Sequence, residues 1–204
     1  NFKLEPPRSR TYAGSISERS PVNLGDFTIS QIVENLKSEW IPEKLEEQFK
    51  GDDFYSPRNA SGLGDAIKED VKKRIDDYLK EINSFFDVGK IHPHYLYSLL
   101  RGIEELLRNK QSFTTEQISQ ILGLFESIRN QGGNFPLKQD NDNSWLTGWI
   151  AVHKLVADIL LYILSDKDEI KRTEIHKLHV EKIENLISYL FTIENSPSKN
   201  DEKP

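Results

Sequence analysis

The amino-acid sequence predicts an all-α protein. Apolar residues recur at three- and four-residue steps in successive stretches of the 204-residue chain, which is the period of amphipathic helices. Proline, glycine and polar clusters separate these stretches, and no segment alternates apolar and polar residues between hairpin turns as a strand does. Because helices joined by short loops pack antiparallel, we expect antiparallel helix pairs that form a HEAT-like α-solenoid or an irregular helical bundle.

The pattern divides the chain into three parts. Residues 1–24 contain several prolines and no helical period, so an extended arm or linker is expected there. Residues 25–193 are predicted to form a single all-α helical domain. Residues 194–204 are polar and charged, which predicts a flexible tail.

The first half of the predicted domain contains three apolar stretches. The first, 29–40, has a single apolar stripe, and Pro42 then suits the first turn of a second helix. A loop over 52–62 leads to the third stretch, 63–86, whose helical period extends over about six turns. This stretch forms either one helix or two helices with a break near 72–74.

The second half of the predicted domain has equally local signals. Pro93 suits the first turn of one helix, and the Thr-x-x-Gln box at 114–117 predicts the start of the next. The segment 145–164 is the most apolar of the chain and has apolar residues on more than one face, which predicts a central, mostly buried helix. The last helix is expected over 173–191.

Charge and residue usage exclude several classes of protein. The chain has 27 Lys and Arg against 33 Asp and Glu, and this net charge of -6 argues against a nucleic-acid partner. The absence of Cys excludes disulfides and thiolate chemistry. No apolar run reaches the roughly 20 residues that span a bilayer, so no membrane partner is expected. We interpret the chain, which contains no Met, as a piece of a longer cytoplasmic protein.

Three features that resemble binding sites are expected to be structural. The glycines of 62–64 open a predicted helix, but no strand precedes them and no P-loop lysine follows, so we expect no cofactor. His153 lies inside the apolar segment and is interpreted as a core histidine. Trp145 and Trp149, four residues apart, are expected in the core rather than at a binding surface.

Charged residues form clusters that do not converge on one site. Adjacent carboxylates point apart on a helix, which favours a solvated polar face. These pairs are Glu46-Glu47, Asp76-Asp77 and Glu104-Glu105. Basic residues at 68–74 and 167–177 are interleaved with acids, which is typical of a soluble helical surface.

Histidine pairs offer one route to a metal site. His176 and His179 are three residues apart and share a helix face, and His92 and His94 flank a helix start. Two histidines alone do not hold a metal ion, and the chain has no HExxH motif, so we expect no metal. A helical zinc module that uses His176 and His179 stays open as a third hypothesis.

One spacing favours an enzyme. Arg172 and His179 resemble the loose Arg-x(4–6)-His pattern of the HEPN family of helical ribonucleases. The resemblance implies that the arginine would hold phosphate while the histidine assists proton transfer at a ribose 2′-OH. It also implies a site formed across a dimer, and Thr173 matches the family's polar position only loosely. A HEPN-like ribonuclease that uses Arg172 and His179 is therefore the alternative hypothesis.

The order of several segments is similar to a known helical region. The segments are 20–22, 29–40, 62–67, 94–107 and 144–146, with sequences SPV, ISQIVENLKSEW, GLGDAI, HYLYSLLRGIEELL and SWL. They resemble the helical, HEAT-like region of very large bacterial ATP-binding proteins, some of which are similar to STAND-type NTPases of antiphage defence. The resemblance implies a scaffold or sensor segment, with nucleotide and effector chemistry elsewhere in a longer chain.

The sequence therefore predicts a non-enzymatic helical scaffold or sensor segment of a larger bacterial protein. Its expected partners are another protein or neighbouring domains of the same chain. No catalytic, cofactor-binding or metal-binding residue is assigned.

Overall fold

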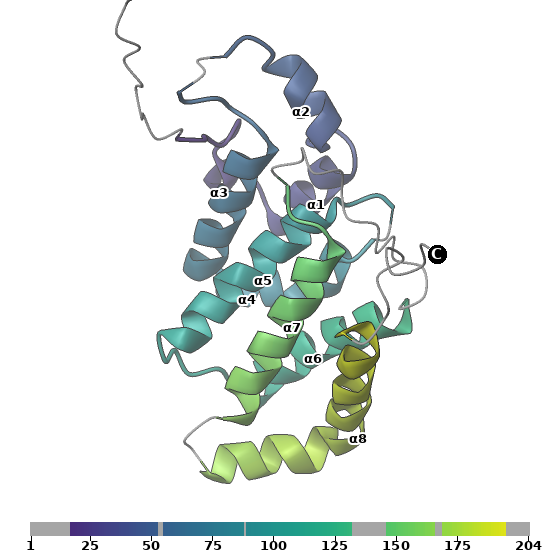
Figure 1. Cartoon of the computed structure of the whole chain (residues 1–204). Coiled ribbons are helices and arrows are strands. Elements are labelled where there is room, and N and C mark those ends of the chain that lie inside the picture. Colours follow the sequence, from purple (N-terminus) through teal and green to yellow (C-terminus); the bar gives the residue numbers. More distant parts are fainter. Residues whose placement is uncertain (1–16, 53–54, 88, 132–145, 166–168, 195–204) are drawn as a thin grey trace, which may run out of the picture.

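The computed structural model describes residues 17–52, 55–87, 89–131, 146–165 and 169–194, and helices joined by turns and loops make up this part of the chain (Figure 1). Its elements are η1 (Leu24–Asp26), α1 (Ile29–Lys37), α2 (Pro42–Gln48), α3 (Ala60–Lys73), α4 (Ile75–Lys80), η2 (Ile82–Phe85), α5 (Pro93–Arg108), α6 (Thr115–Asn130), α7 (Trp149–Leu164) and α8 (Glu169–Glu194). The described residues contain no strand, and the one β-type contact among them is an isolated bridge between Arg19 and Arg58. The all-α prediction is therefore confirmed for the described part.

Local signals fix where several helices begin. Pro42 and Pro93 occupy the first turns of α2 and α5, as predicted. At the start of α6, the Thr114 hydroxyl accepts from the Gln117 backbone N–H at 3.2 Å, and the Gln117 side chain accepts from the Thr114 N–H at 2.8 Å. The predicted capping box is thus confirmed, and Thr28 and Gln31 form a second one at α1.

Of the two alternatives for 63–86, the structure has the break: Arg74 separates α3 from α4. The Arg74 guanidinium donates to the Asp70 carboxylate and also to the backbone carbonyls of Leu24 and Phe27, at 3.1 and 3.0 Å. The Tyr78 hydroxyl donates to the same carboxylate at 2.7 Å. This cluster satisfies a nearly buried carboxylate and ties the η1 turn to the α3–α4 pair.

The described end of the N-terminal arm packs on the start of α3. The Arg19 N–H donates to the Pro57 carbonyl at 2.8 Å, and the Arg19 carbonyl accepts from the Asn59 N–H at 3.3 Å. The Arg19 backbone passes so close to Gly62 that a Cβ at Gly62 would lie 2.2 Å from the Arg19 carbonyl oxygen. Gly62 is therefore required for the close approach of the two backbones.

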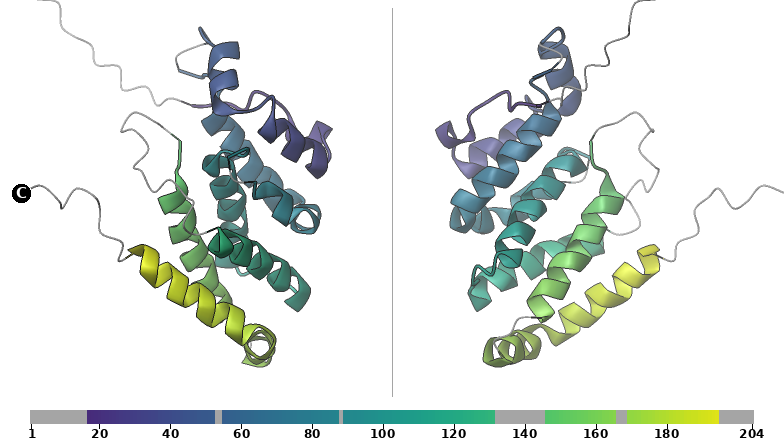
Figure 2. Two further views of the ribbon diagram at one scale, coloured as in Figure 1. Left: turned by 90° about the vertical axis from the view of Figure 1, so that its right-hand side faces the viewer. Right: turned by 60° about the vertical axis from the view of Figure 1, so that its left-hand side comes forward.

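The longer helices form two rows around one apolar core. In the first row α3 packs against α5, and α5 packs against α7 (Figure 2). In the second row α4 and η2 pack against α6, and α6 packs against α8. None of the helices among the described residues combines the length and the apolar character needed to cross a bilayer.

The structure corrects the interpretation of the two last helices. The prediction of a mostly buried α7 is wrong for one face, because Ile150, Leu161 and Tyr162 are 43%, 66% and 36% exposed. Both views of Figure 2 place α7 and α8 at the edge of the described ribbon, not at its centre. The last helix begins at Glu169, earlier than expected, and its backbone leaves helical geometry at His179 (φ −131°, ψ 16°).

Candidate functional site

His179, the histidine of the ribonuclease hypothesis, is held at the kink of α8. Its Nε2 lies 2.8 Å from the hydroxyl oxygen of Ser119 on α6. Because the Ser119 hydroxyl donates to the Thr115 carbonyl at 2.9 Å, it accepts from Nε2–H, which leaves Nδ1 unprotonated. Nδ1 is buried and has no hydrogen-bond partner among the described residues. Burial, and next the nearby Lys182, lower the pKa of His179, so its imidazole is neutral near pH 7.

Arg172 and His176, the two residues considered as partners of His179, lie on a different part of α8. Arg172 and His176 are exposed on the half of α8 that precedes the kink, whereas His179 is half-buried and turned toward α6. A general acid or base must reach its substrate, whereas Nδ1 of His179 is buried and Nε2 is bonded to Ser119. No group of three potential metal ligands occurs among the described residues, which include His176 and His179.

His94 joins three parts of the fold. The neighbouring His92 caps α5, because its Nδ1 accepts from the His94 N–H at 3.2 Å. The Nδ1 of His94 accepts from the Thr147 N–H at 3.2 Å, just before α7. A Cβ at Gly64 on α3 would lie 2.4 Å from His94 Nε2, so that glycine makes room for the ring. Burial lowers the pKa of His94 to about 4, which keeps the ring neutral near pH 7, and its Nε2 is buried without a hydrogen-bond partner among the described residues.

His153 connects α7 to α8. Its Nδ1–H donates to the Trp149 carbonyl at 2.7 Å, and its Nε2 accepts from the Tyr189 hydroxyl at 3.0 Å. The side chain is 3% exposed, and burial lowers its pKa. The expected core role of His153 fits this geometry, as does that of Trp149, which is buried; Trp145 lies outside the described residues.

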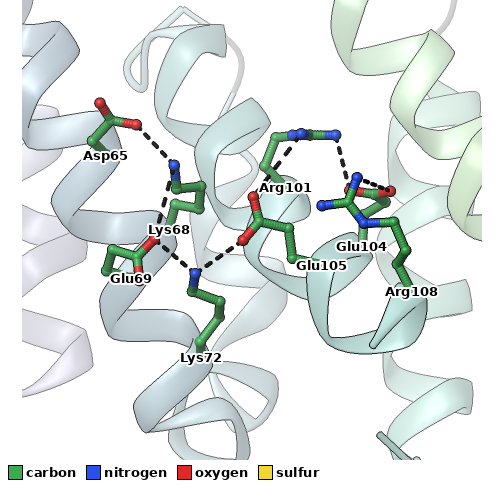
Figure 3. A network of polar contacts seen from close by, with 8 residues as sticks. All are labelled: Asp65, Lys68, Glu69, Lys72, Arg101, Glu104, Glu105 and Arg108. Atoms are coloured by element: carbon green, nitrogen blue, oxygen red, sulfur yellow. Dashed lines mark hydrogen bonds and ion pairs between the residues drawn. The ribbon is translucent and has the colours of Figure 1, made fainter. Parts of the chain in front are cut away.

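A network of ion pairs covers the contact between α3 and α5 (Figure 3). Lys72 bridges the two helices, with its Nζ 2.7 Å from Glu69 and 2.9 Å from Glu105. These contacts raise the pKa of Lys72 and lower that of Glu105. Four acidic and four basic side chains balance, so the network offers no net charge to a ligand. Its members are Asp65, Lys68, Glu69, Lys72, Arg101, Glu104, Glu105 and Arg108.

Glu104 departs from the predicted solvated face. The residue is 5% exposed, and its carboxylate accepts from Arg101 at 2.8 Å and lies 3.9 Å from Arg108. Two guanidiniums at helical spacing provide the partners that a buried carboxylate requires. By contrast, Glu46 and Glu47 are exposed as predicted.

The feature that sequence reasoning missed is the exposure of large apolar side chains on the last two helices. Eight large apolar side chains are exposed among the described residues, and Tyr55 is the single one outside α7 and α8. The other seven, called here the α7/α8 apolar surface, are Ile150, Leu161, Tyr162, Leu178, Val180, Ile187 and Phe191. Apolar residues on a second face of 145–164 were the available signal, and they were interpreted as burial instead.

Comparisons of this chain with protein-family models, with curated proteins and with solved structures found no match. The resemblance to the helical region of large bacterial ATP-binding proteins therefore stays a prediction.

Proposed function

We propose that this chain is a non-enzymatic helical scaffold or sensor segment of a larger bacterial, cytoplasmic protein, and that it mediates protein–protein or interdomain contacts through the α7/α8 apolar surface. One observation carries the proposal: seven of the eight exposed large apolar side chains of the described residues lie on two helices that contact each other. Such residues are normally scattered over a monomer's surface, and their concentration marks an interaction site.

The two rows of helices support the solenoid form of this proposal. Rows α3–α5–α7 and α4–α6–α8 bring successive helix pairs side by side, as stacked repeats do. In such a stack a helix pair that is followed by another pair carries an apolar face, which the next pair covers. The exposed faces of α7 and α8 match this expectation.

The burial and hydrogen bonds of the histidines also favour a binding role over a catalytic one. His94 and His153 are buried and bonded within the fold, and His179 is bonded to Ser119. The hypothesis of a HEPN-like ribonuclease needs a histidine that can exchange a proton with substrate. The geometry of His179 lacks that access, so the ribonuclease is the less favoured alternative.

Binding measurements on the full chain test the proposal. The chain would serve as bait in a bacterial lysate, and any captured protein would be identified and purified. The partner should bind the wild-type chain and the Tyr55→Glu control, but not the Leu161→Glu/Phe191→Glu variant. Equal binding by that variant would overturn the proposal. So would RNA cleavage by the purified chain that is lost in His179→Ala.

A further inference from the structure

The exposed face of α7 has the spacing of a helix-pairing seam. Ile150, Lys154, Ala157 and Leu161 follow one another at steps of four, three and four residues, which places them along one line of the helix. Ile150, Lys154 and Leu161 are exposed, and Ala157 is half-buried. In Figure 1, α7 lies in front of α5, with no described element in front of it.

The charges of this face do not pair within α7. Lys154 and Asp158 are four residues apart and both exposed, yet no ion pair joins them, and neither has one elsewhere in the described part of the chain. A lysine that precedes its acid by four residues is the weaker order for a pair within one helix. Both charges are therefore available to a partner.

We infer that this face binds a second copy of the chain, with the two α7 helices antiparallel; the inference rests on the proposed function and names its partner. A two-fold axis between residues 155 and 156 places Ile150 opposite Leu161 of the second copy, at both ends of the contact. Ala157 then meets the stem of Lys154 near the axis, where its small side chain permits close approach.

The same two-fold axis also brings opposite charges together, in two symmetry-related pairs of Lys154 and Asp158. Lys154 of each copy then lies one residue from the level of Asp158 of the other copy, which is about 1.5 Å along the helix axis. A parallel arrangement would instead bring Lys154 against Lys154. The face is thus complementary to itself in charge and in apolar contacts only when the helices run antiparallel, as an isologous interface requires.

Sedimentation equilibrium of the full chain over a range of concentrations tests the inference. We expect the mass to rise from 23.6 kDa toward twice that value. Leu161→Glu should weaken the dimer by about 100-fold, because two apolar contacts are lost per dimer. Leu178→Glu, at a similarly exposed site on α8, is the matched control and should leave the mass unchanged. Circular dichroism checks that each variant keeps its helices.

Exchanging the charges of Lys154 and Asp158 distinguishes the loss of this interface from a folding defect. Lys154→Asp leaves only acids at the two positions and Asp158→Lys leaves only bases, so each variant alone should dimerise about tenfold more weakly. An equimolar mixture of the two variants should recover wild-type affinity, because each chain then supplies the charge that the other lacks.

Two results would overturn the inference. One is a mass of 23.6 kDa for the wild-type chain at every concentration, and the other is a mixture no tighter than the single variants. If a different protein still binds the α7/α8 apolar surface in either case, the proposed function stands and only the identity of the partner is wrong.

Discussion

Replacing Gly62 with alanine tests how the N-terminal arm is attached. The new Cβ would lie 2.2 Å from the carbonyl oxygen and 2.3 Å from the carbonyl carbon of Arg19. Both are backbone atoms, so no side-chain rotation relieves the contact, and the arm must move away from α3. We expect Gly62→Ala to weaken the folded state by displacing the arm.

The size of the effect follows from the contacts that the arm makes. Two backbone hydrogen bonds, from Arg19 to Pro57 and from Asn59 to Arg19, are lost when the arm moves, and each contributes about 1 kcal/mol. Alanine in a helix returns up to about 1 kcal/mol relative to glycine. Because the displaced arm no longer overlaps the new Cβ, the free energy of unfolding should fall by about 1–2 kcal/mol.

Urea denaturation followed by circular dichroism measures this change. Gly123→Ala is the matched control, because Gly123 lies within α6 and a Cβ there would meet no atom within 4 Å. That variant should be more stable than wild type, by about 1 kcal/mol. If Gly62→Ala is stabilised as much as Gly123→Ala, the arm does not pack on α3 and the reasoning is refuted.

Two further predictions concern buried polar groups. Arg74→Ala should cost about 3 kcal/mol of unfolding free energy in the same urea assay, because it leaves the Asp70 carboxylate buried without its cation. Lys80→Ala removes only an exposed pair with Asp77 and should cost less than about 1 kcal/mol; equal losses would contradict the assigned role of Arg74. Burial lowers the pKa of His94 from 6.5 to about 4, so the unfolded chain binds a proton that the folded chain excludes between these values. Stability should therefore fall by up to about 3 kcal/mol as the pH drops from 6.5 to 4, and His94→Gln should lack this part of the pH dependence; an unchanged profile in that variant would show that His94 is not its source.

Local signals in the sequence were enough to predict how several helices begin and end. Pro93 and the Thr114–Gln117 box act within one turn, so their effect does not depend on distant residues. The break at Arg74 was one of two alternatives that the sequence left open, because the apolar period continues through it from Val71 to Ile75. What the sequence did not contain was the reason for the break, which is the contact of Arg74 with carbonyls about 50 positions earlier.

The surfaces of the helices were harder to predict, because burial depends on which helices become neighbours. The apolar period of α7 predicts that two faces are apolar, but not that one of them stays uncovered. Glu104 was expected in solvent, and the flanking Arg101 and Arg108 instead allow it to be buried. The kink at His179 has no local proline or glycine, and the structure supplies its partner, Ser119, from another helix.

The attachment of the arm has a mechanical consequence. Arg19 and Arg58 form a parallel bridge, so residues 17–20 run alongside the loop that leads directly into α3. Tension applied to the chain before residue 17 is therefore borne first by the hydrogen bonds of Ser17 and Arg19 to that loop, which are loaded together in shear. The force enters the molecule at the N-terminus of α3 and bypasses η1 and α1. A pull from that side would act on the α3–α5–α7 row before it could unwind the helices that come first in the sequence.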